Sequence, residues 1–203
     1  MKEKLILTDV DGCLLEWNDA FESYMVDAGY KRIPNTDHHY NLSWRFDASF
    51  EVVRKMVVQF NECQDIAHLH PLPGAVATVN RLVEHGFRFV CITSLSDAPE
   101  AKQYRTHNLI NEFGNVFDDI ICLPVGASKS HILENWGGTG LFWLEDHFTN
   151  AEAGHEVGLQ PILFETAYNS HLTTDLFPRT SLHTPWADVE RIVTEEYSLL
   201  EVA

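Results

Sequence analysis

Basic residues are scarce in this chain. Among 203 residues, Lys and Arg together number 14 against 30 Asp and Glu, which gives a formal net charge of -16 and a pI of about 4.9. Most of such a surface repels a polyanion, so we do not expect a nucleic acid polymer as a partner. A small phosphate ester can still bind where a few cations and a metal ion converge.

Long apolar runs and paired cysteines are also missing. No apolar run approaches the length of a membrane span, and the first residues lead directly into a strand pattern, so we expect neither a membrane partner nor a signal peptide. Free buried thiols in a reducing cytoplasm explain the cysteines most simply, because no metal-ligand spacing joins them. The four are Cys13, Cys63, Cys91 and Cys122.

The most informative stretch is KLILTDVDGCLL, from Lys4 to Leu15. Its apolar run predicts a short strand that is buried on both faces, as in a parallel sheet. The strand pattern ends in Asp9, Asp11 and Gly12. Burying two carboxylates there costs free energy unless a cation or a proton relay uses them. The glycine lets the backbone turn sharply and approach a ligand closely.

Asp9 and Asp11 allow three interpretations. A calcium loop of the EF-hand type is excluded, because Cys13 and Ala20 occupy positions that need oxygen ligands and a strand precedes the motif. A plain strand-end turn with two solvated aspartates stays open. The third is a nucleophilic aspartate with magnesium, in which Asp9 attacks phosphorus and Asp11 handles the leaving-group proton.

Strand and helix patterns alternate along the rest of the chain. Residues 16–70 carry apolar residues at helical spacing, and PLPG follows at 71–74. The expected strands after the first span 87–93, 120–123, 141–144 and 160–164. The expected helices span 75–85, 97–113, 129–136, 147–157 and 185–200. This alternation predicts an α/β fold with a parallel sheet of about five strands.

Further polar side chains fall at strand ends or helix starts. Thr93 and Ser94 follow the second strand, Lys129 opens a helix, and Glu145 and Asp146 end the fourth strand. The lysine is not part of a P-loop, because a serine precedes it where that motif has glycine. The histidine pairs His38-His39 and His68-x-His70 lack the flanking residues of a helical zinc site, so we interpret them as surface residues or as residues that support a site without binding its ligand.

These four motifs, in this order, resemble those of the haloacid dehalogenase superfamily of phosphohydrolases. The resemblance implies a Rossmann-like three-layer α/β/α core formed by residues 1–15 and 71–203. It also implies a small helical cap, residues 16–70, inserted after the first strand. In that family the aspartate at the first position forms an aspartyl-phosphate intermediate. Asp9 would be the nucleophile and Asp11 the acid and base.

A narrower resemblance points to the 5'(3')-deoxyribonucleotidases. It rests on PLPGAV at 71–76, ILFETAYNSHL at 162–172, and LH at 182–183 with WAD at 186–188. It implies an enzyme that dephosphorylates (deoxy)ribonucleoside monophosphates, and a homodimer is compatible with it. Arg105 falls near a position where that family has an additional lysine.

The resemblance assigns the remaining roles residue by residue. Phosphate would be bound by Thr93, Ser94 and Lys129. Mg²⁺ would be bound by Asp9, Asp11 through its backbone oxygen, and Asp146. Substrate would contact Trp17, Trp44 and Phe46. Two alternatives stay open, namely a phosphatase of the same mechanism for another small phosphate ester, and a non-catalytic binding protein with this fold.

Overall fold

The computed structural model describes residues 4–201 and confirms the predicted α/β fold. Five parallel strands form one sheet in the order β3-β2-β1-β4-β5. The strands are β1 (Leu5–Thr8), β2 (Arg88–Thr93), β3 (Phe117–Cys122), β4 (Phe142–Glu145) and β5 (Gln160–Leu163). The helices that connect or cover them are α3 (Ala75–Glu84), α4 (Pro99–Phe113), α5 (Ser130–Leu133), α6 (Phe148–Glu156) and α7 (Pro185–Glu201).

The strand order fixes where a ligand can bind. From β1 the chain moves outward to β2 and β3, and it then returns to the other side of β1 for β4 and β5. In open parallel sheets, ligands bind at the carboxyl ends of the strands, where the order of strands reverses. Here that place lies between β1 and β4.

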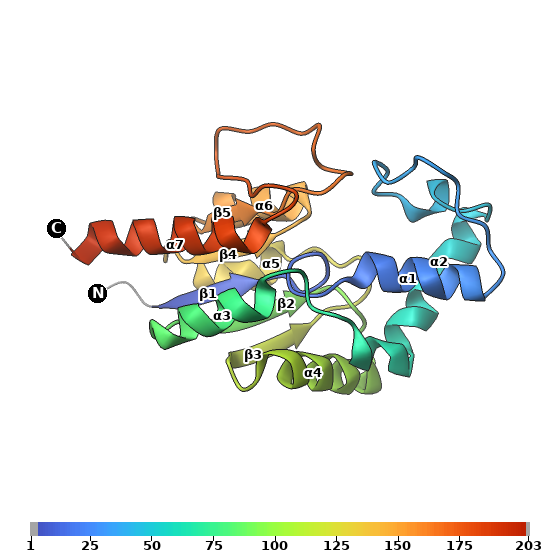
Figure 1. The fold of residues 1–203 in the computed structure, drawn as a ribbon, viewed down its shortest axis with the longest axis horizontal. Helices are drawn as coiled ribbons and strands as arrows, with labels where there is room; N and C mark the ends of the chain where they lie inside the picture. The colour runs from blue at the N-terminus through green and yellow to red at the C-terminus, as the bar shows by residue number, and fades with distance from the viewer. Residues whose placement is uncertain (1–3, 202–203) are drawn as a thin grey trace.

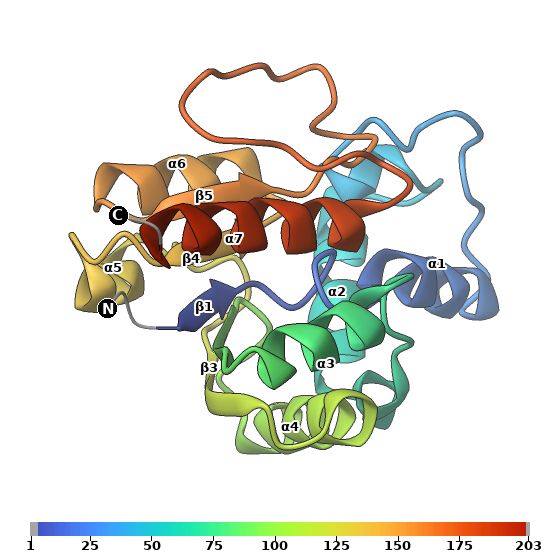
Figure 2. The same ribbon diagram turned by 60° about the vertical axis from the view of Figure 1, so that its left-hand side comes forward.

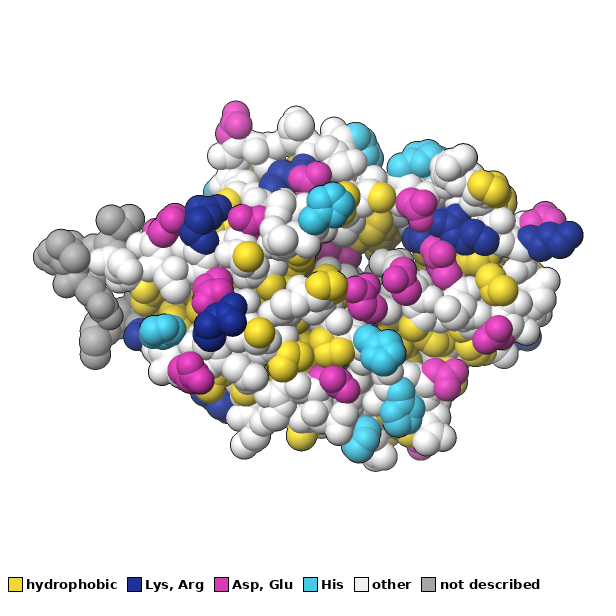
Figure 3. Space-filling model, viewed as in Figure 1, with side chains coloured by type: hydrophobic (Ala, Val, Ile, Leu, Met, Phe, Trp, Pro, Cys, Tyr) yellow, Lys and Arg dark blue, Asp and Glu magenta, His cyan; other side chains and the backbone are white. Residues whose placement is uncertain are grey.

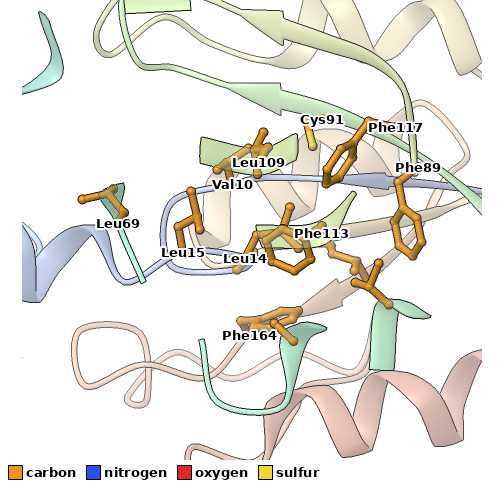
Figure 4. Close-up of a cluster of buried hydrophobic side chains, with 14 of the residues drawn as sticks. Val10, Leu14, Leu15, Leu69, Phe89, Cys91, Leu109, Phe113, Phe117 and Phe164 are labelled. Atoms are coloured by element: carbon orange, nitrogen blue, oxygen red, sulfur yellow. The ribbon is translucent and has the colours of Figure 1, made fainter. Parts of the chain in front are cut away.

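The two faces of the sheet bury different rows of apolar side chains. Ile6 pairs with Phe89 and Phe142, and this row joins the cluster that includes residues of α3, α4 and α7. Figure 4 shows part of this cluster, with Phe89, Phe113 and Phe164 among the labelled side chains. Leu7, one position further, belongs to the cluster on the opposite face. The alternation explains why β1 reads as a continuous apolar run.

Residues 16–70 follow the first strand and contain helices but no strand. The segment holds α1 (Trp17–Asp27), the 3₁₀ helix η1 (Leu42–Trp44), α2 (Phe50–Glu62) and the 3₁₀ helix η2 (Gln64–His68). Its two ends meet, because Glu16 N donates to His70 O at 2.9 Å. The segment lies beyond the carboxyl ends of the strands (Figures 1 and 2). It therefore stands over the edge of the sheet where a ligand is expected. That it forms a separate domain stays a prediction.

Two elements differ from the sequence prediction. Strand β3 begins at Phe117 instead of residue 120, because the exposed Asp118 and Asp119 interrupt its apolar pattern. Charged residues are common on such edge strands, where they oppose pairing with another sheet. The helix expected over 129–136 is a short α5 followed by the 3₁₀ helix η3 (Glu134–Trp136).

The surface is predominantly acidic, as the composition requires. On the face drawn in Figure 3, Asp and Glu side chains outnumber those of Lys and Arg. Among the helices of residues 4–201, none has the length and apolar character of a membrane span.

Candidate active site

Polar residues from distant parts of the sequence meet at the carboxyl edge of the sheet. Asp9 directly follows β1, Thr93 ends β2, and Glu145 ends β4 with Asp146 after it. All four side chains are buried. Because parallel strands end at the same edge, the strand pattern alone brings these residues together.

Lys129 forms the centre of this cluster. Its Nζ lies 2.6 Å from Asp9 Oδ2 and 2.8 Å from Glu145 Oε2, and its side chain is 2% exposed. Burial alone would lower the pKa of this lysine, but Asp9 and Glu145 raise it above its ordinary value. The ammonium is therefore held in its charged form beside Asp9.

Asp146 is held from two sides. Gly12 has a φ of 80°, and a Cβ on it would lie 2.1 Å from Asp146 Oδ2, so only glycine lets this turn approach the carboxylate. The Tyr168 hydroxyl donates a hydrogen bond to the same oxygen. Asn169 Nδ2 donates to the main-chain oxygen of Asp146 at 2.7 Å. These contacts fix the direction of the carboxylate.

The buried acids have the donor atoms of a magnesium site. Oxygen atoms of Asp9, Glu145 and Asp146 all lie within 4.8 Å of one another. Mg²⁺ prefers oxygen ligands and uses few carboxylates. Glu145 already accepts hydrogen bonds on both oxygens, from Lys129 and from the backbone N–H of Asp146 and His147. Asp9 is similarly engaged, because Val10 N–H donates to its Oδ1 and Lys129 lies against its Oδ2, whereas Asp146 accepts the Tyr168 hydrogen bond on Oδ2. An ion held by Asp9 and Asp146 would therefore share the Asp9 carboxylate with Lys129.

The raised pKa values of two of these acids also indicate that a bound cation would stabilise the site. Burial, followed by the nearby Glu145, raises the pKa of Asp9 to about 8, although Lys129 opposes the shift. Burial and then Asp9 raise the pKa of Asp146 to about 6. Asp9 therefore lacks enough positive charge around it to be mostly ionised at neutral pH, and a divalent cation would supply that charge.

Asp11 and Thr93 form the neighbouring part of the site. Arg105 Nη2 lies 2.6 Å from Asp11 Oδ1, and Thr93 Oγ1 lies 3.5 Å from Asp11 Oδ2. Ser94 is close by in sequence, but its hydroxyl donates to the backbone oxygen of Ala127 at 2.9 Å. That bond ties the end of β2 to the loop that precedes Lys129.

The three predicted substrate-binding aromatics lie in different surroundings. Trp17 stacks on Phe21 with ring centroids 4.8 Å apart, and its Nε1 donates to Asn61. Phe46 is 1% exposed within the hydrophobic core, so it offers no surface to a substrate here. Trp44 is 59% exposed. The structure does not support the substrate role predicted for Phe46, because packing inside the 16–70 segment uses its ring.

A different aromatic side chain reaches the acidic cluster from this segment. The centroid of the Tyr40 ring lies 4.5 Å from that of His147 and 5.3 Å from that of Tyr168. The Tyr168 hydroxyl in turn donates a hydrogen bond to Asp146. No role was predicted for His147 or Tyr168, and Tyr40 is not among the three aromatics predicted to contact substrate. Tyr40 and Tyr168 lie in loops, where no helical or strand spacing indicates which side chains meet.

Sequence comparisons match part of the chain to a curated protein. No family model matches the chain. An uncharacterized 32.4 kDa protein of Enterobacteria phage T4 is 25% identical over 134 residues, which cover 64% of this chain and 48% of that protein. The chain thus spans about half the length of this curated relative.

Solved structures match over nearly the whole chain. A predicted phosphatase from Clostridium acetobutylicum gives a TM-score of 0.67 at 13% identity and covers 96% of this chain and 100% of that one. A haloacid dehalogenase-like hydrolase from Streptococcus pneumoniae gives 0.63 at 12%, over 94% and 99%. D,D-heptose 1,7-bisphosphate phosphatase from B. bronchiseptica, complexed with magnesium and phosphate, gives 0.59 at 17%, over 95% and 99%. The chain therefore shares the fold of haloacid dehalogenase-like hydrolases.

Proposed function

We propose that the protein is a magnesium-dependent phosphohydrolase that acts on (deoxy)ribonucleoside monophosphates through an aspartyl-phosphate intermediate. The observation that carries the proposal is the Lys129 ammonium, buried at 2.6 Å from Asp9 and 2.8 Å from Glu145 beside the acidic cluster. A structural ion pair needs one carboxylate for one ammonium, whereas three buried carboxylates surround this lysine's site. The carboxylates in excess of the one ammonium would bind a metal cation and attack a phosphate ester.

Each residue has a step in the proposed reaction. An oxygen of Asp9 forms a bond to phosphorus while the bond from phosphorus to the leaving oxygen breaks. The electron pair stays on the leaving oxygen, which takes a proton from Asp11. In the second step water gives a proton back to Asp11 and attacks phosphorus, and the bond from Asp9 to phosphorus breaks. The Thr93 hydroxyl donates a hydrogen bond to a phosphoryl oxygen, and Lys129 offsets the charge of the phosphoryl oxygens. The Ser94 hydroxyl would have to exchange its bond to the backbone oxygen of Ala127 for one to phosphate.

The metal requirement is part of the proposal. Asp9, the backbone oxygen of Asp11, and Asp146 would hold Mg²⁺. When bound, the ion would offset the negative charge of the carboxylates and the phosphoryl group. The pKa of Asp9, raised by burial to about 8, supports this requirement, because a nucleophilic carboxylate must be ionised to attack.

The substrate class rests on the aromatic residues around the acidic cluster. The Tyr168 hydroxyl donates to Asp146, and the Tyr40 ring packs with the rings of Tyr168 and His147, so aromatic rings border the acidic cluster. We expect the group attached to phosphate to lie there. A planar base can stack on such rings, and stacking contributes ~1–3 kcal/mol per base. The four free cysteines agree with a cytoplasmic enzyme, which is the compartment we propose.

Phosphate release from a substrate panel tests the proposal. Purified protein is incubated with 5'- and 3'-nucleoside monophosphates of both sugars and with sugar phosphates, with and without Mg²⁺. We expect metal-dependent release from nucleotides and its loss in Asp9→Asn, whereas the exposed Asp175→Asn serves as the matched control. Trapping with labelled substrate should put phosphate on Asp9.

Two outcomes would favour the alternatives. Release from sugar phosphates but not from nucleotides would favour a phosphatase for another small phosphate ester, the class named for the B. bronchiseptica structure. Equal phosphate release by Asp9→Asn and wild type would leave a binding protein as the better account.

A further inference from the structure

Arg105 is a completely buried arginine outside the set of predicted site residues. It lies in α4, its side chain is 0% exposed, and its Nε and Nη1 atoms find no hydrogen-bond acceptor within residues 4–201. A guanidinium always carries its charge, and burying it without acceptors is expensive. Something at this position must offset that cost.

The group that offsets it is Asp11. Arg105 Nη2 lies 2.6 Å from Asp11 Oδ1, and no other ion pair of Arg105 is found in the described part of the chain. The arginine in turn is the main support of this carboxylate, because the other side chain in contact with it, Thr93, lies at a long 3.5 Å. The two side chains therefore hold each other.

The two side chains of this ion pair differ in their exposure to solvent. The Asp11 side chain is 23% exposed, whereas that of Arg105 is completely buried. The carboxylate thus stands between the guanidinium and the open side of the site. Arg105 lies behind Asp11, where it can fix the carboxylate without lying in the path of an incoming substrate.

We infer that Arg105 is a positioning residue that holds the Asp11 carboxyl group toward the leaving-group oxygen. The inference rests on the proposed function, in which Asp11 gives its proton to that oxygen as the bond to phosphorus breaks. A nucleoside or sugar leaves as a poor, strongly basic alkoxide and needs this proton. A 4-nitrophenolate leaves readily without it. General acid catalysis typically contributes ~10²–10⁴-fold, so a misplaced acid costs part of this factor.

The test compares two leaving groups in the same variants. For Arg105→Lys and Arg105→Met, we measure kcat/KM with a nucleoside monophosphate and with 4-nitrophenyl phosphate at saturating Mg²⁺. We expect a loss at least about 10-fold larger for the nucleotide, smaller in Arg105→Lys than in Arg105→Met. Asp11→Asn should give the same selective pattern. Lys102→Met, an exposed change on the same helix, is the matched control.

Four other results of this comparison would lead to different conclusions. Equal losses with both substrates would overturn the inference, because damage to the fold or to phosphate binding does not depend on the leaving group. Unchanged activity of both variants would overturn it as well. If wild type cleaves a sugar phosphate but no nucleotide, the substrate class fails, and the sugar phosphate takes the nucleotide's place in the comparison. Wild type inactive on every ester would overturn the proposed function and this inference together.

Discussion

Replacing Lys129 by methionine tests the electrostatics of the site in the absence of any substrate. Lys129 is 2% exposed and bridges Asp9 and Glu145, so Lys129→Met leaves two buried carboxylates without their ammonium. Removing one partner of a buried ion pair typically costs ~3–5 kcal/mol. For a chain of this length that corresponds to a fall in Tm of about 10 °C.

The cost should depend on pH in a definite direction. The pKa of Asp9, raised by burial to about 8, means that at pH 5 this carboxyl is protonated with or without the lysine. At pH 9 only the wild type has a partner for the ionised group. Lys129 stays charged throughout, because Asp9 and Glu145 raise its pKa. We therefore expect the full loss at pH 9 and a loss smaller by about 1 kcal/mol or more at pH 5.

Urea unfolding followed by tryptophan fluorescence measures both values. The protein is kept in EDTA, and the exposed Lys55→Met serves as the control with the same change of net charge. If Lys129→Met is unfolded at pH 9, lowering the pH to 5 should restore the folded state. A loss below 1 kcal/mol at pH 9, or the same loss at both pH values, would refute the reasoning.

Two further predictions concern metal-free wild type and the support of Asp146. Because burial raises the folded-state pKa of Asp9 to about 8 and of Asp146 to about 6, folded protein holds protons that unfolded protein releases above pH 4. The free energy of unfolding of the metal-free protein should therefore fall by several kcal/mol from about pH 4 to pH 8. The stabilisation by added Mg²⁺ should grow over the same range. Calorimetry that shows no change of metal-free stability with pH would contradict this. Tyr168→Phe removes the hydrogen bond to Asp146 and should weaken Mn²⁺ binding, measured by electron paramagnetic resonance, roughly 10-fold. Tyr104→Phe is the control and should bind Mn²⁺ like wild type. Equal affinities of Tyr168→Phe and wild type would exclude a role of Tyr168 in orienting Asp146.

The carboxylates of the candidate site were predictable because their positions follow from strand ends. Asp9 and Asp146 lie 137 positions apart in sequence, yet each follows an apolar run that could be recognised as a buried strand. Parallel strands deliver their carboxyl ends to one edge, so strand recognition was sufficient. The same reasoning gave the order of alternating elements and hence the fold.

Arg105 shows what a closer examination of helical spacing could have added. Ala101 and Leu109 lie four residues before and after it in α4, and both are fully buried. An arginine between two apolar residues at this spacing lies on the buried face of the helix and needs a charged partner there. The signal was present in the sequence, but the identity of Asp11 as the partner was not.

Which aromatic side chain of the 16–70 segment reaches the acidic cluster could not be predicted in the same way. Phe46 and Tyr40 both lie in the irregular part of the 16–70 segment, yet one packs against Phe21 in the core and the other reaches His147. Neither position belongs to a regular helix or strand, so no period decides which ring turns inward. Only tertiary packing separates the two.

The charges at the site connect its stability with its proposed chemistry. Four carboxylates, Asp9, Asp11, Glu145 and Asp146, face two cations, Lys129 and Arg105, so full ionisation leaves two negative charges in a buried site. Without a further cation the folded protein lowers this charge by keeping protons, which is what the raised pKa of Asp9 expresses. A protonated Asp9 cannot attack phosphorus. Under the proposed function, loading of a divalent cation and ionisation of the nucleophile are therefore one linked equilibrium, and phosphate binds productively only after it.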